Sequence, residues 1–161
     1  MATTTTDIRS TINDLIETLK DGEEGFRTSA DKLQEPALRA QFHSFASQRA
    51  SFAASLQGEV SRIGGEPETT GSTAGSLHRG WIDLKSSVMG NSDQAILEEA
   101  ERGEDSSVKA YRDALSKDLP EDIRSVIASQ YKDVLATHNT VKALRDGVAI
   151  TTTATGTPRA Y

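Results

Sequence analysis

The chain has 161 residues, a formal net charge of −6 and no cysteine. Its length suits a single domain with a buried core, and the lack of cysteine excludes disulfides, thiol catalysis and thiolate metal sites. The acidic balance argues against nucleic-acid binding, which needs clustered Lys and Arg. With no signal-peptide pattern and no apolar run near the roughly 20 residues of a membrane span, we expect a cytoplasmic protein without a membrane partner.

The first half of the chain predicts two long amphipathic helices. From Ile8 to Leu33 apolar residues recur at alternating steps of four and three, which is the period of one helix face. Pro36 suits the first turn of a second helix, and Gly64 with Gly65 would end it. The apolar seam of this second helix is interrupted by an arginine: Leu38, Phe42, Phe45, Arg49, Phe52, Leu56 and Ile63.

The second half predicts a connection followed by two more long helices. Residues 64–75 are rich in turn formers, and Trp81 and Leu84 would pack a short helix, from Leu77 to Gly90, across the outside of the bundle. Asn91 or Ser92 can cap a third long helix, and Pro120 opens a last one that we expect to end at Gly147. The seam of the third long helix carries two acids: Leu97, Glu101, Glu104, Val108, Tyr111 and Leu115.

These elements predict an all-α fold, a four-helix bundle in residues 7–147. The connection of about 28 residues is long enough to return along the bundle, so the second and third long helices can run parallel, as in the one-crossover topology of ferritin-like bundles. Residues 1–6 and 148–161 are Thr-rich tails that follow no helical period. We expect disordered tails, with strand addition to another copy as the alternative.

Charged residues interrupt the apolar seams at similar depths in the predicted bundle. Pairing each helical hairpin outward from its turn brings five of them toward mid-bundle: Glu23, Arg49, Glu101, Glu104 and His138. A buried charge is costly unless it is paired, so these residues should neutralise one another or hold an ion.

Two interpretations of this polar layer stay open. In the first, Arg49 binds the carboxylates in a structural network, because its planar fork can engage a carboxylate through two hydrogen bonds. In the second, Glu23, Glu101, Glu104 and His138 form an iron or manganese site. The full di-metal pattern needs Glu-x-x-His on two helices, whereas Leu135 stands three residues before His138. We therefore favour the structural network and expect no cofactor.

Several strings along the chain resemble one protein family. They are LIETLKDGEEGFRTSA, QRASFAASLQGEVSRIGG, HRGWIDLKS, ERGEDSSVKAYRDAL and HNTVKALRD. Together they resemble the bacterial four-helix-bundle family called domain of unknown function 2383, placed in the ferritin-like superfamily. The resemblance implies a ferritin-like bundle over about residues 7–147 and supplies no catalytic residue. By analogy with related bundles, it implies an association with stress responses.

The functional expectation is a non-catalytic, homo-oligomeric helical bundle with a structural Arg–carboxylate layer, although the question of an enzyme stays open. The first alternative is a di-metal ferritin-like protein or oxidase. The second is a structural protein whose Thr-rich tails join copies into larger assemblies.

Overall fold

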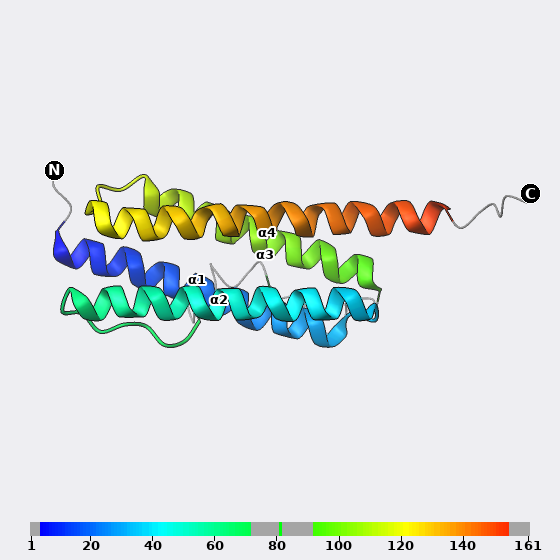
Figure 1. Cartoon of the computed structure of the whole chain (residues 1–161), viewed down its shortest axis with the longest axis horizontal. Coiled ribbons are helices and arrows are strands. Elements are labelled where there is room, and N and C mark those ends of the chain that lie inside the picture. The colour runs from blue at the N-terminus through cyan, green and yellow to red at the C-terminus, as the bar shows by residue number, and fades with distance from the viewer. Residues whose placement is uncertain (1–3, 72–80, 82–91, 155–161) are drawn as a thin grey trace, which may run out of the picture.

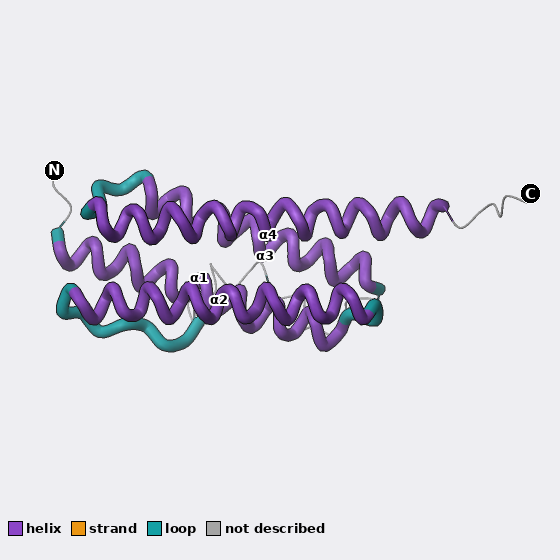
Figure 2. Tube along the Cα trace, in the orientation of Figure 1, coloured by secondary structure: helices purple, strands orange, loops and turns teal. Residues whose placement is uncertain are grey.

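The computed structural model describes residues 4–71, 81 and 92–154, and within them it consists of four long helices (Figure 1). They are α1 (Thr5–Lys32), α2 (Pro36–Arg62), α3 (Asp93–Leu115) and α4 (Glu121–Ala154). Coloured by secondary structure, the described part shows the helices, short turns between α1 and α2 and between α3 and α4, and a loop that follows α2 (Figure 2). The predicted all-α bundle is confirmed. None of these helices combines the length and apolarity that a bilayer span requires.

The helix ends follow local side-chain chemistry. Thr4 caps α1 by accepting from the backbone N–H of Asp7 at 3.1 Å, and the Asp7 carboxylate accepts in return from the Thr4 N–H at 3.1 Å. Ser92 caps α3 by accepting from Ala95 N at 3.2 Å. Beyond α2, Gly64 adopts a φ of 79°, a left-handed conformation that ends a helix.

The chain direction confirms the crossover topology. α1 and α2 are antiparallel, α3 and α4 are antiparallel, and α2 and α3 run the same way (Figure 1). The connection between α2 and α3 therefore returns along the bundle, as its length predicts. The predicted short helix from Leu77 to Gly90 lies outside the described residues except for Trp81. Of the predicted Thr-rich tails, 1–6 and 148–161, residues 5–6 belong to α1 and residues 148–154 belong to α4, whereas residues 1–3 and 155–161 lie outside the described residues.

The predicted end of the last helix at Gly147 is wrong, because α4 continues to Ala154. Gly147 does not take up the left-handed φ that would end a helix. A glycine inside a helix costs only about 1 kcal/mol relative to alanine, so it weakens the helix without breaking it. Figure 1 shows the end of α4 reaching past the other three helices.

The buried side chains form two apolar clusters, one toward each end of the bundle. The first, which contains Ile12, Leu19, Leu56, Tyr111 and Ile127, gathers residues from all four helices. The second contains Phe26, Phe42, Trp81, Leu97 and Val141. Between the two, at the middle of α2 and α3, lie Arg49 and Glu104, so the apolar core is interrupted at the depth that the seam pattern predicts.

Trp81, a predicted packing residue of the short helix, is buried against α1 and α3. Its side chain is 3% exposed, and its ring centroid lies 5.2 Å from that of Phe26. A Cβ added at Gly25 of α1 or at Gly103 of α3 would lie 2.3 Å or 2.1 Å from the indole. The two glycines therefore leave the space that the ring fills, and Trp81 anchors the crossover connection between α1 and α3.

Candidate functional site

The centre of the bundle holds a fully buried ion pair. Nη2 of Arg49 on α2 donates to Oε2 of Glu104 on α3 at 2.7 Å, and both side chains are 0% exposed. The guanidinium carbon lies 5.3 Å from the Phe26 ring centroid, within cation–π range. Gly22 of α1 faces the aliphatic stem, since a Cβ there would lie 3.6 Å from Arg49 Cγ. Three helices thus enclose one cation and one carboxylate.

Burial dominates the electrostatics of this pair. Desolvation raises the pKa of Glu104 above its ordinary value, and the attraction and hydrogen bond of Arg49 oppose that rise without cancelling it. Among the described residues, Nε and Nη1 of Arg49 and Oε1 of Glu104 have no hydrogen-bond partner. The pair is therefore an incompletely satisfied polar centre in an apolar surrounding.

Glu23 lies outside this centre, at the edge of α1. Its carboxylate accepts from Lys20 Nζ at 3.0 Å and from Arg27 Nη2 at 2.9 Å, both on the same helix. Burial would raise the pKa of Glu23, but the hydrogen bonds and charges of Lys20 and Arg27 together lower it below the ordinary value. Gly22, one position earlier, is the residue of α1 that faces Arg49.

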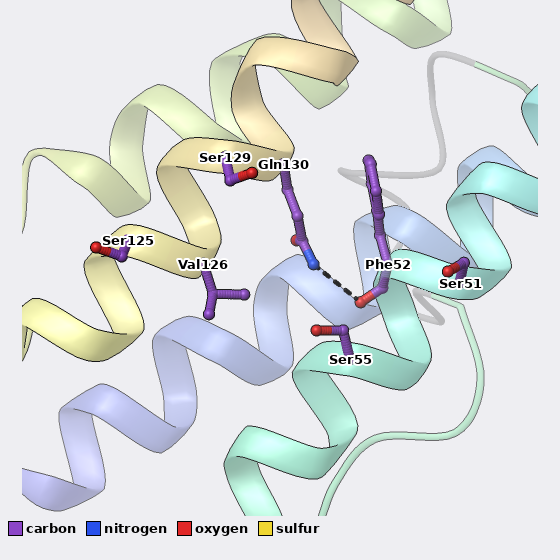
Figure 3. Close-up of a pocket in the computed structure, with 7 residues that line it drawn as sticks. All are labelled: Ser51, Phe52, Ser55, Ser125, Val126, Ser129 and Gln130. Atoms are coloured by element: carbon purple, nitrogen blue, oxygen red, sulfur yellow. Dashed lines mark hydrogen bonds between the residues drawn. The ribbon is translucent and has the colours of Figure 1, made fainter.

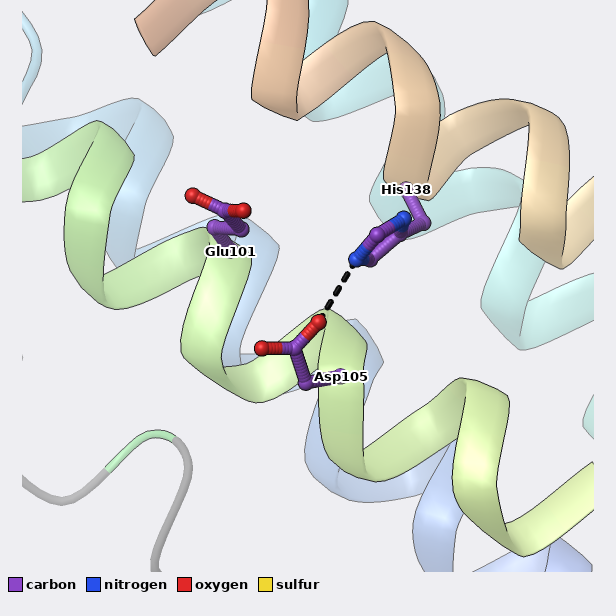
Figure 4. A group of neighbouring side chains, drawn as sticks. All are labelled: Glu101, Asp105 and His138. Carbon is purple, nitrogen blue, oxygen red and sulfur yellow. Dashed lines mark hydrogen bonds and ion pairs between the residues drawn. The ribbon is translucent and has the colours of Figure 1, made fainter.

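Glu101 and His138 lie in a second polar group, at the outer side of the α3–α4 interface (Figure 4). His138 Nε2 lies 2.6 Å from Oδ1 of Asp105. Glu101 accepts a hydrogen bond from Arg145 Nη1. Three side chains, those of Glu101, Asp105 and His138, each offer one ligand atom, and these atoms lie within 4.8 Å of one another. Among the described residues, this is the one such group of potential metal ligands.

The structure thus divides the predicted polar layer. Arg49 and Glu104 meet in the core, Glu101 and His138 come together near the surface, and Glu23 joins neither group. Two residues of the surface group, Asp105 and Arg145, are absent from the sequence-based prediction. The pattern offered a signal for Asp105, because it stands one helical turn after Glu101 and so shares its face.

A shallow groove between α2 and α4 has a volume of about 470 Å³. Figure 3 shows its seven lining residues, with the Gln130 amide donating to the Phe52 carbonyl at 3.3 Å. Four of the seven are serines, and the set contains no acid, base or imidazole: Ser51, Phe52, Ser55, Ser125, Val126, Ser129 and Gln130. These residues provide small hydroxyl and apolar contacts but no general acid or base.

Comparisons with known proteins agree with this architecture. A two-domain protein from Anabaena variabilis, which contains DJ-1/ThiJ/PfpI-like and ferritin-like domains, is among the similar solved structures. That match has a TM-score of 0.74 and 14% identity, and it covers 91% of this chain but only 41% of the other. A point mutant of Dps1 from Mycobacterium smegmatis matches with a TM-score of 0.73 and 13% identity, covering 88% of this chain and 96% of the other. At these identities the likeness shows the fold alone.

The family model described as domain of unknown function (DUF2383) matches residues 7–117. No curated protein sequence matches the chain. Because the family match spans most of the bundle, the chain belongs to the DUF2383 family.

Proposed function

We propose that this DUF2383 protein is a non-catalytic helical bundle whose central charges are structural, and that it acts through association. One observation carries the proposal: the Arg49 guanidinium, fully buried, occupies the middle of the bundle and pairs with Glu104. Because an arginine side chain stays charged, a buried carboxylate that neutralises it serves to stabilise the fold. A second cation at the same place would meet the repulsion of the first.

The residues at the centre do not fit the di-metal site found in the cores of other ferritin-like bundles. That site needs a Glu from each of two helices and Glu-x-x-His from each of the other two. Here α2 contributes Arg49 at this depth, and Leu135 replaces the Glu that would precede His138. Nε2 of His138 contacts the exposed carboxylate of Asp105. The donor set therefore lacks both the number and the direction of ligands that two metal ions require.

Metal loading tests the proposal directly. We expect the full-length chain, loaded anaerobically with Fe(II) or Mn(II), to retain fewer than two ions and to show no oxygen consumption on exposure to air. We also expect Glu104→Gln to leave the metal content unchanged, because Glu104 binds Arg49. Two ions per chain that are lost in Glu104→Gln would contradict the structural assignment of the pair.

Self-association is the second part of the proposal. Only 35% of the residues are aliphatic or aromatic, so burial between copies would add to a lean core. We expect light scattering to give a mass above that of one chain. Deleting residues 150–161 separates the two routes to assembly: an unchanged mass assigns the contact to the bundle, and a reduced mass assigns it to the Thr-rich tail. A monomeric full chain would contradict self-association.

A role in stress responses rests on analogy with other ferritin-like proteins and is proposed on that ground alone. It predicts that the amount of this protein rises when its host is exposed to peroxide or starvation. Immunoblotting before and after exposure measures this, and constant levels under both conditions would remove the stress role from the proposal.

A further inference from the structure

The surface group on α3 and α4 has the composition of a metal site that is separate from the bundle centre. Glu101 and Asp105 stand one turn apart on α3, and His138 faces them from α4 (Figure 4). The side chains of Glu101 and His138 are 13% and 16% exposed, whereas that of Asp105 is 65% exposed. Two of the three side chains are thus held by packing, and the third can reorient in solvent.

One imidazole nitrogen and two carboxylate oxygens suit a divalent transition-metal ion such as Zn²⁺ or Co²⁺. Such an ion binds its ligands at about 2.0–2.2 Å, so donor atoms around it lie about 3–3.6 Å apart. The three donors here already lie within 4.8 Å of one another, and Asp105 Oδ1 is 2.6 Å from His138 Nε2. A small rotation of the exposed Asp105 side chain would separate this close pair and open the space between them.

Arg145 is the competing cation at this place. Its Nη1 donates to Glu101 Oε2, so an incoming ion must displace that contact. Arg145 also donates to Asp146 Oδ1, from Nε at 3.1 Å and from Nη2 at 3.0 Å. If the Glu101 contact breaks, the guanidinium therefore keeps a carboxylate partner. Replacing Arg145 should therefore strengthen metal binding, because the competing cation is gone. If Arg145 only stabilised the fold, its replacement would not strengthen metal binding.

We propose that Glu101, Asp105 and His138 bind one divalent transition-metal ion, with solvent in the remaining coordination position. The site is distinct from the Arg49–Glu104 pair, because Glu104 is buried on the inner face of α3 and is held by Arg49. Metal binding here is compatible with a structural centre and does not depend on it.

Titration of the full-length chain tests this site, with Zn²⁺ followed by calorimetry and Co²⁺ followed by visible absorption. We expect one ion per chain. His138→Ala should weaken metal binding by about tenfold to a hundredfold, and Asp105→Asn should weaken it by about tenfold. His43→Ala is the matched control, because His43 is exposed on α2 away from the group, and it should leave the affinity unchanged. Arg145→Gln should tighten binding several-fold.

Melting curves of each variant without metal show whether it is folded. Asp105→Asn keeps the test valid even if His138→Ala unfolds, because Asp105 is mostly exposed. Absence of saturable Zn²⁺ binding would overturn the proposal. So would binding that is insensitive to both His138→Ala and Asp105→Asn, or binding that is lost in His43→Ala. Weaker binding in Arg145→Gln would likewise show that Arg145 supports the site and would overturn the exchange described above.

Discussion

Two glutamates of this bundle, Glu104 at its centre and Glu23 at the edge of α1, each accept hydrogen bonds from arginine, yet their pKa values move in opposite directions. Burial raises the pKa of Glu104 despite Arg49. For Glu23 burial acts in the same sense, but Lys20 and Arg27 together outweigh it and lower the pKa. Relative to a free carboxyl group, ionisation is thus less favourable in the core and more favourable at the edge, although both carboxyl groups have a basic partner.

The difference shows that the degree of burial and the number of basic partners together decide the direction in which the pKa of a carboxyl group moves. Glu23 keeps 14% of its side chain exposed and has two basic partners, so its charge costs little to maintain. Glu104 has no exposure, one partner and one unsatisfied oxygen. In the core, removing the cation should therefore be expensive, whereas at the edge it should be nearly neutral.

The largest expected effect separates the two arginines. Arg49→Ala should lower the free energy of unfolding by about 3–5 kcal/mol, because it leaves a cavity and an unpaired buried carboxyl group. Arg27→Ala is the matched control: its side chain is 58% exposed, and we expect a loss below about 1 kcal/mol. Urea denaturation measures both. Equal losses for the two variants would contradict the contrast between centre and edge.

The packing beside the buried pair gives the next largest effect. Gly103→Ala places a Cβ against the indole of Trp81 and should destabilise the protein by about 1–3 kcal/mol. Gly58→Ala in α2 meets nothing within 4 Å and should stabilise it by about 0.5–1 kcal/mol through helix propensity. Thermal unfolding followed by circular dichroism compares them. A neutral Gly103→Ala would mean that the indole is not held as tightly as described.

The pH dependence of stability tests the pKa direction of Glu104. A carboxyl group whose pKa is raised on folding contributes stability fully below its ordinary value of 4.5, and this contribution is lost as the pH rises through the folded value. Wild type should therefore lose stability relative to Glu104→Gln as the pH rises from 4 through the folded pKa of Glu104. A relative gain for wild type over this range would show that Arg49 outweighs burial.

Glu23 should show the smallest effect and the opposite sign. Its lowered pKa contributes stability above 4.5 that is lost as the pH falls through the folded value. Glu23→Gln should cost about 0.5 kcal/mol at pH 7 and less at pH 3, and 0.5 M salt should reduce the cost at pH 7. Denaturation at the two pH values measures this, and a cost above 2 kcal/mol would place Glu23 with the buried pair.

The helical period of the apolar residues, together with the turn and capping residues between the helices, was sufficient to predict the bundle, its crossover topology and the contact of Arg49 with Glu104. Both residues occupy seam positions, and a seam residue must face the core. Glu23 was predicted to lie in the core because residues were paired by their position along the helix axis, with less attention to the face of the helix on which each one lies. The adjacent Gly22 faces Arg49, which turns Glu23 toward Lys20 and Arg27.

Contacts between helices were harder to predict. Asp105 shares a helix face with Glu101, but Arg145 stands off the apolar seams, where a charged residue is normally solvated, and neither position alone identifies a partner on the facing helix. The burial of Trp81 depends on the space left by glycines on two different helices, which a one-dimensional pattern does not contain. Gly147 was interpreted as a stop, but a helix can continue through a single glycine at modest cost.

Trp81 also gives this protein an internal optical probe. It is the single tryptophan of the chain, so its fluorescence arises from one place, the apolar gap between α1 and α3. The emission spectrum of the unlabelled protein therefore reports whether the crossover connection is seated against the bundle. If that connection detaches before the helices unfold, a red shift in emission will precede the loss of circular dichroism. The fluorescence will then measure how firmly the connection is anchored, and the circular dichroism will measure the stability of the four helices.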